Sequence, residues 1–229
     1  GGNGNDQLFG GDGNDLITDT AGNDIIHGEA GNDRIFAGIG DDTVFGGDGN
    51  DVIDGGQGLD AISGGQGNDI IRGGEDDDEL VGNEGDDWVE GGIGGDLIVG
   101  DQGAPTGQVP LFAANDVLIG GAGGDRMQGF SGDDIMLGQG GFDTFDGRLG
   151  YDWASFEQET QGISADLSRA AFIAQAGAPG GDAIRDIFIE TEGVSGTRFN
   201  DVLLGSNPSV LDPLFNALTN VNLIFGLQG

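Results

Sequence analysis

Residues 46–72 read GGDGNDVID GGQGLDAIS GGQGNDIIR, which are three consecutive units of nine residues. In each unit the fourth residue is glycine, the sixth is aspartate and the eighth is apolar. A fixed short period is the signature of a repeat protein, in which each unit packs against its neighbours along a stack. The three units therefore set the register in which the rest of the chain is read.

The register extends over sixteen repeats, from residue 1 to residue 155. Eleven repeats cover 1–99 without a gap, an insertion at about 104–114 interrupts the twelfth, and four more follow. Position 6 is Asp and position 8 is apolar in all sixteen, and position 4 is Gly in all but one, where Asp76 replaces it. Chance does not produce such a pattern, so an ordinary globular domain is excluded for this part.

Each repeat predicts a short strand and a turn. The three residues around position 8 predict a strand whose middle side chain faces the core. The other six residues, mostly glycine, are expected to form the turn, because glycine accepts positive φ. One repeat reverses the chain, so we expect an all-β parallel roll in which odd repeats build one sheet and even repeats the other.

The position-6 aspartates are the candidate metal ligands. Carboxylate and carbonyl oxygens suit a hard cation, and a flexible turn suits Ca²⁺ better than Mg²⁺. Stacked carboxylates about 5 Å apart would repel one another without a cation. The candidate ligands are Asp6, Asp15, Asp24, Asp33, Asp42, Asp51, Asp60, Asp69, Asp78, Asp87, Asp96, Asp116, Asp125, Asp134, Asp143 and Asp152.

The composition restricts the classes of molecule that the chain is expected to bind. The net charge of −34 disfavours nucleic acid, anionic membranes and acidic polymers, and points to cations instead. The chain has no cysteine, so disulfides and thiolate metal sites are excluded. No apolar run reaches the length of a membrane span, and no signal peptide is visible.

No catalytic or cofactor-binding residue is predicted. His27, the only histidine, lies at position 9, next to a strand centre, and is expected on the surface. The zinc-protease and lipase motifs HExxH and GxSxG are absent, and the glycine-rich turns lack the lysine of a phosphate-binding loop. A small-molecule substrate is therefore not expected, and this segment is interpreted as non-enzymatic.

The motif G-G-x-G-x-D-x-U-x, with U apolar, resembles the hemolysin-type nonapeptide of the repeats-in-toxin (RTX) family over about two thirds of the chain. The resemblance implies a right-handed parallel β-roll with Ca²⁺ between the turns of repeats n and n+2. Both position-6 aspartates and backbone carbonyls would hold each ion, which predicts roughly ten to fourteen ions. The implied carbonyl ligands include Gly4, Gly13, Gly22, Gly31, Gly40, Gly49, Gly58, Gly67, Gly85, Gly94, Gly123, Gly132, Gly141 and Gly150.

The resemblance also implies export by a type I system and a secreted or cell-surface location. We expect the chain to be a fragment of a larger secreted bacterial protein and to contact other domains of that polypeptide. The leading interpretation is a module that folds on exposure to extracellular calcium. The alternatives are a structural or ligand-binding region of a cell-surface adhesin, or an accessory module of a secreted protease, lipase, peroxidase or polysaccharide epimerase.

Three regions are expected. Residues 1–155 form the nonapeptide roll, and 156–205 continue it in wider coils, with strands near 162–168 and 184–189, ending in a degenerate repeat. Residues 206–229 are interpreted as an excursion followed by the start of further repeats.

The two sheets are expected to differ in the polarity of the residues on their outer faces. Position 7 should point outward, because position 8 points inward. The odd repeats place mostly polar residues there, whereas seven of the eight even repeats place apolar ones. We hypothesise that this apolar row is covered by the C-terminal segments or by a partner domain. The row comprises Leu16, Arg34, Val52, Ile70, Trp88, Val117, Ile135 and Trp153.

Overall fold

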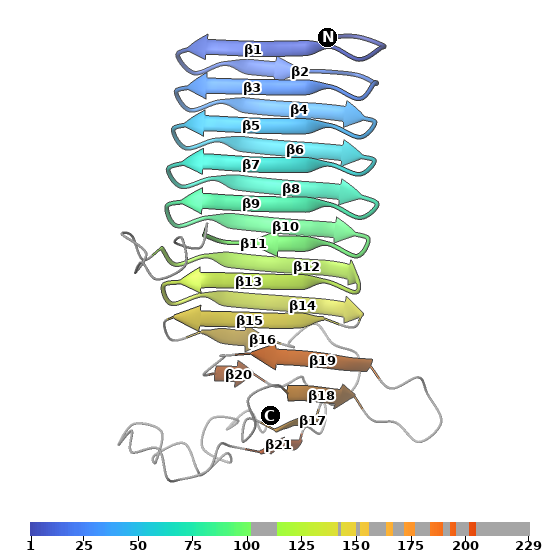
Figure 1. The fold of residues 1–229 in the computed structure, drawn as a ribbon, viewed down its shortest axis with the longest axis vertical. Coiled ribbons are helices and arrows are strands. Elements are labelled where there is room, and N and C mark those ends of the chain that lie inside the picture. Colours follow the sequence, from blue (N-terminus) through green and yellow to red (C-terminus); the bar gives the residue numbers. More distant parts are fainter. Residues whose placement is uncertain are drawn as a thin grey trace, which may run out of the picture.

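In the computed structural model the chain forms an elongated stack of parallel β-coils, shown in Figure 1 with the axis of the stack vertical. The structure describes residues 1–101, 114–141, 143–149, 152–155, 164–166, 172–176, 184–189, 193–195 and 202–204. Within these residues every regular element is a β-strand, and no helix is long and apolar enough to cross a membrane. Most of the predicted insertion and all of 205–229 lie outside the described residues.

The strands follow the nonapeptides. They are β1 (Gln7–Asp12), β2 (Leu16–Thr18), β3 (Ile25–Ala30), β4 (Arg34–Ile39), β5 (Thr43–Asp48), β6 (Val52–Gln57), β7 (Ala61–Gln66), β8 (Ile70–Glu75), β9 (Glu79–Glu84), β10 (Trp88–Ile93), β11 (Leu97–Val99), β12 (Val117–Gly123), β13 (Arg126–Ser131), β14 (Ile135–Gly141), β15 (Thr144–Leu149), β16 (Trp153–Ser155), β17 (Ser164–Asp166), β18 (Phe172–Ala176), β19 (Ile184–Ile189), β20 (Gly193–Ser195) and β21 (Val202–Leu204).

The strands sort into two facing sheets by repeat parity. One sheet has the order β1-β3-β5-β7-β9-β11-β13-β15-β19-β18, and the other has the order β2-β4-β6-β8-β10-β12-β14-β16-β20. Neighbours within each nonapeptide sheet are parallel and in register, so that Thr43 lies beside Ala61, its equivalent two repeats later. The predicted assignment of odd and even repeats to separate sheets is confirmed.

The core is a single layer of position-8 side chains between the two sheets. From Ile26 to Ala154 each of these side chains is almost fully buried, whereas Leu8 in the first repeat is only partly buried. Fully burying an aliphatic side chain contributes about 1.5–3 kcal/mol. Because each coil adds two such side chains to one continuous layer, the core depends on stacking and cannot form in an isolated repeat.

The strands are longer, and the turns shorter, than the prediction of a three-residue strand and a six-residue turn. A typical strand such as β5 has six residues and runs from position 7 to position 3 of the next repeat. Positions 2 and 3 remain paired, because Gly47 lies in register with Gly65 and Asp48 with Gln66. Gly47 has a φ of 119°, and a Cβ there would overlap the carbonyl of Glu29. Position 2 thus has a left-handed backbone inside the strand, which favours glycine, although Glu29 and Phe130 adopt the same conformation in other repeats.

The insertion after Asp101 adds chain without breaking the stack. Trp88 pairs with Val117, so equivalent residues are 29 apart in sequence there, instead of 18 elsewhere. The carboxylate of Asp101 is buried and accepts a hydrogen bond of 2.6 Å from the hydroxyl of Ser131. This bond connects the start of the insertion, at Asp101, to the end of β13.

Beyond the sixteenth repeat the two sheets gain further strands. β19 pairs in parallel with β15, and β20 with β16, while β18 runs antiparallel to β19 (Figure 1). β17 and β21 form a separate two-stranded sheet. β19 coincides with the strand predicted at 184–189.

Position 7 points outward, as expected. In the even row Leu16 is 70% exposed, Trp88 46% and Trp153 38%, so the described residues do not cover this row.

The outer face of the odd sheet is less polar than its position-7 row suggests, because Phe9 and Phe45 at position 9 are exposed. Their rings stack on the two sides of His27, with centroids 5.1 and 4.9 Å apart. The only histidine therefore belongs to a surface aromatic ladder.

Substitution of the two adjacent isoleucines of β8, one exposed and one buried, tests the one-layer core. Ile71 is 0% exposed and Ile70 is 52% exposed, so Ile71→Ala should cost about 2–5 kcal/mol of unfolding free energy, as cavities in packed cores do. Ile70→Ala should cost less than about 1 kcal/mol. Denaturant unfolding in saturating Ca²⁺ measures both, and equal losses would contradict a one-layer core.

Candidate metal centre

The sixteen position-6 aspartates form two columns, one at each edge of the roll. The odd repeats supply one column, which begins at Asp6, and the even repeats supply the other, which begins at Asp15. From Asp24 to Asp152 every one of these residues is buried, with at most 3% of its surface exposed. Burying a carboxylate costs free energy unless hydrogen bonds or an opposite charge compensate it. The partners of each carboxylate oxygen therefore determine whether the turn can bind a cation.

From Asp24 to Asp152, one carboxylate oxygen of each aspartate is satisfied by the backbone. The Oδ1 atom accepts a hydrogen bond from the N–H of the position-6 aspartate two repeats earlier, as from Asp33 to Asp51 at 2.8 Å. The distances along both columns lie between 2.7 and 3.1 Å. The ladder continues past the insertion, where the N–H of Asp87 donates to Asp116 at 2.9 Å. This bond fixes the direction in which each carboxylate points.

The second oxygen is buried and has no hydrogen-bond partner in most of these residues. This holds for the Oδ2 atoms of Asp15, Asp24, Asp33, Asp42, Asp51, Asp60, Asp69, Asp78, Asp87, Asp96, Asp116, Asp125 and Asp134. Hydrogen bonds satisfy almost all buried polar atoms of folded proteins, so a repeated exception demands a missing partner. A bound cation would be such a partner for these carboxylate oxygens.

The position-1 glycines make room for this second oxygen. A Cβ on Gly64 would overlap Asp69 Oδ2, and the carbonyl oxygen of Gly82 lies 2.8 Å from the same point. A carboxylate oxygen and a carbonyl oxygen from successive coils therefore converge beside this glycine, and the same pair of atoms lies beside Gly46 and Gly73. Among the glycines, the sequence interpretation named those at position 4 as candidate site residues and did not name those at position 1.

The position-4 glycines form the turn itself. All those predicted as site residues have positive φ, except Gly150, which lies outside the described residues. Gly49 has a φ of 136°, and a Cβ there would overlap the carbonyl of Gly31 in the coil before it. The one substitution, Asp76, adopts the same left-handed backbone with a φ of 79°, which Asp tolerates better than most residues.

The site without a cation is electrostatically unfavourable. Burial raises the pKa of Asp60, Asp69 and Asp87 to about 7, and that of Asp116 to about 8, and nearby aspartates add to the increase. The backbone hydrogen bonds to these carboxylates oppose the increase but do not cancel it. At neutral pH the turns therefore have to take up either protons or cations.

A second ladder was not expected. The side chain at position 5 accepts a hydrogen bond from the position-5 N–H two repeats later, as from Asn68 to Asn50 at 3.0 Å and from Asn50 to Asn32 at 2.9 Å. It runs in the direction opposite to the aspartate ladder. The signal was visible, because position 5 is Asn or Asp in eleven of the sixteen repeats. These side chains orient the turn from its outer side.

The donor set fits Ca²⁺. Every converging atom is an oxygen, from carboxylates and backbone carbonyls, and the hard cations that prefer such ligands include Ca²⁺, which accepts irregular geometry. The lone histidine lies on a sheet face, and the chain has no thiol. The arrangement therefore offers nothing that a softer transition metal would prefer.

Comparison with known families agrees with this geometry. The family described as RTX calcium-binding nonapeptide repeat (4 copies) matches residues 1–35, 9–44, 36–71, 72–106 and 112–153. No curated protein matches the chain. The family match covers well over half of the sequence, and the parallel roll is the architecture that the repeat predicts. The chain belongs to the RTX calcium-binding nonapeptide repeat family.

Proposed function

We propose that this calcium-binding repeat module folds when it meets extracellular Ca²⁺ and so supports type I secretion and folding of a larger secreted protein. The observation that carries the proposal is the column of buried aspartates whose second oxygen lacks a partner. Where Ca²⁺ is scarce, these carboxylates repel, and the 51 glycines favour the unfolded chain. Where Ca²⁺ is abundant, each ion that binds only the folded state stabilises it by mass action.

In this proposal each ion lies between the turns of repeats n and n+2. Two position-6 carboxylates and the glycine carbonyls around them supply its oxygens, so an aspartate in mid-column serves two ions. The unpartnered Oδ2 atoms and the space above the position-1 glycines support this assignment. The fourteen possible pairs set the upper limit of the expected ten to fourteen ions.

One observation favours an additional role in packing against another domain. The exposed even row presents Leu16, Ile70, Trp88, Ile135 and Trp153 on one face of the sheet. Exposed apolar rows of this kind mark interfaces more often than free surface. An accessory module of a secreted enzyme would use such a face, and the same face would join successive modules in an adhesin.

Removing calcium should unfold the chain. Circular dichroism should show a disordered chain in chelator and a β-spectrum in millimolar Ca²⁺. The same concentration of Mg²⁺ should not fold it, because Mg²⁺ demands octahedral geometry and gives up its waters reluctantly. A β-spectrum at neutral pH in excess chelator would falsify the proposal.

Mutation of one mid-column aspartate should disable two sites. Asp51→Ala removes a carboxylate shared by the turns before and after it, and it also leaves the N–H of Asp33 without its acceptor. We expect a loss of about two bound ions and a clear destabilisation. Asp54→Ala is the matched control, because Asp54 lies on the outer sheet face at position 9. Equal effects on ion count in equilibrium dialysis would exclude shared ligation.

Acid should partly replace calcium. The folded-state pKa values of about 7 for Asp69 and about 8 for Asp116 exceed the ordinary value of 3.8, so the metal-free fold binds more protons than the unfolded chain. Its stability is greatest below about pH 4 and is lost as the pH rises through about 7–8. Lowering the pH from about 8 to about 5 in chelator should therefore increase the β-signal. A decrease on acidification would show that these carboxylates are not buried together.

A further inference from the structure

The third repeat departs from the pattern at position 1. It begins with Asp19, where most repeats have the glycine that makes room for the position-6 oxygen. Asp19 therefore places a side chain in the space that is otherwise kept free for converging oxygens. No feature of the nonapeptide motif accounts for a carboxylate at this point.

The side chain of Asp19 points into the gap between the first two coils of the odd column. A Cβ on Gly1, the position-1 residue of the preceding coil, would overlap Asp19 Oδ2 and lie 2.5 Å from Asp6 Oδ2. The Asp19 side chain is 0% exposed, its Oδ1 accepts a hydrogen bond from the N–H of Thr20, and its Oδ2 lies 3.1 Å from the amino group of Gly1. This carboxylate is thus held in the gap and turned away from solvent.

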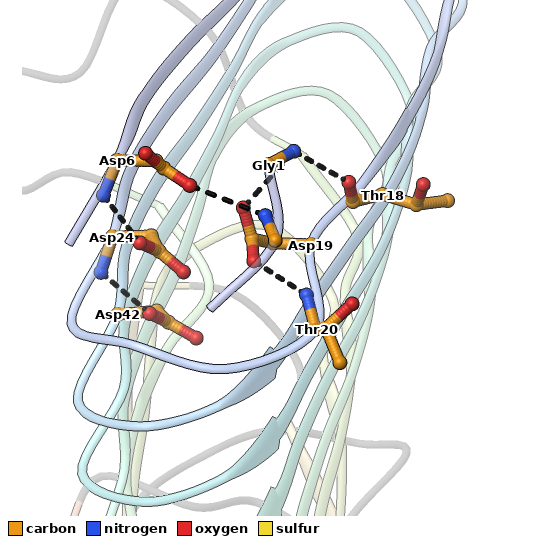
Figure 2. Close-up of polar contacts among 8 residues, drawn as sticks. Gly1, Asp6, Thr18, Asp19, Thr20, Asp24 and Asp42 are labelled. Carbon is orange, nitrogen blue, oxygen red and sulfur yellow. Dashed lines mark hydrogen bonds and ion pairs between the residues drawn. The ribbon is translucent and has the colours of Figure 1, made fainter. Parts of the chain in front are cut away.

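Three carboxylates meet there. Asp6, Asp19 and Asp24 each place one carboxylate oxygen within 4.8 Å of the others. Figure 2 shows Asp6 and Asp24 stacked, with their carboxylates directed towards the side on which Asp19 lies. Asp24 is only 1% exposed, its Oδ1 is held by the N–H of Asp6, and its Oδ2 has no partner. A buried, unpartnered oxygen therefore faces the cluster and calls for a cation.

We propose that Asp6, Asp19 and Asp24 form a three-carboxylate Ca²⁺ site that binds its ion more tightly than the two-carboxylate sites along the rest of the roll. The number of charged ligands is a main determinant of calcium affinity, and a third carboxylate shielded from water adds attraction that is little screened. This site fills first as calcium rises and orders the first two odd turns. The inference rests on the proposed calcium-dependent folding.

The test is a calcium titration of the whole chain against a chromophoric chelator, which resolves tight sites from weak ones. Asp19→Asn removes the charge, and Asp19→Gly restores the residue that other repeats carry and therefore keeps the turn geometry. Asp12→Asn is the control, because Asp12 is exposed at position 3 of the preceding repeat and its loss changes the net charge equally. Wild type should bind one ion about tenfold or more tighter than the rest.

The expected result is that both Asp19 variants lose this tight ion and keep the weaker ones, while Asp12→Asn retains it. If all three variants titrate like wild type, Asp19 only pairs with the amino group of Gly1, and the inference is wrong. Tighter binding by either Asp19 variant would show that the side chain obstructs the site, which also overturns it. If wild type itself binds no calcium, both the inference and the proposed function fail.

Discussion

The structure depends on a buried position-6 carboxylate with two unlike oxygens, which recurs along both columns of the roll. In a residue such as Asp51 the first oxygen accepts a backbone hydrogen bond that ties one coil to the next. The second oxygen is buried without a donor. The first oxygen therefore sets the geometry of the turn, and the second makes that geometry unfavourable until a cation arrives. Folding and calcium binding are in this view the same event, because the bond that builds the site also buries its unsatisfied charge.

Glycine and the thin core follow from the same constraint. The second oxygen of Asp69 occupies the place of a side chain on Gly64, and the stacked carbonyls exclude one on Gly49. The glycines that admit these oxygens raise the entropy of the unfolded chain. The apolar core that helps to offset that entropy is thin, because it consists mainly of a single layer of position-8 residues. This balance supports the proposal that bound ions determine whether the stack forms.

Much of this arrangement could be predicted from the repeat alone. The period specified the two sheets, and the invariant aspartate and apolar positions specified the two aspartate columns and the core, because each has a single place in a stacked coil. The length of the strands could not be predicted, because a glycine such as Gly47 is typical of a turn. In the stack, however, Gly47 stays paired with the equivalent residue of the neighbouring strand. The role of Asp19 also escaped prediction, since it depends on which side chains meet across a coil that is eighteen residues long. The position-5 ladder could have been predicted from the Asn and Asp residues at that position, but it was not.

We expect calcium to bind the second carboxylate oxygen of the position-6 aspartates along both columns. A crystal structure of the calcium-saturated chain tests this most directly in mid-column, at Asp51 and Asp69, where both coils are complete. An ion should lie between the two turns, about 2.3–2.6 Å from the Oδ2 atoms and from backbone carbonyl oxygens. Ordered water or a protonated carboxyl at that place, with the roll intact and no ion bound, would contradict it.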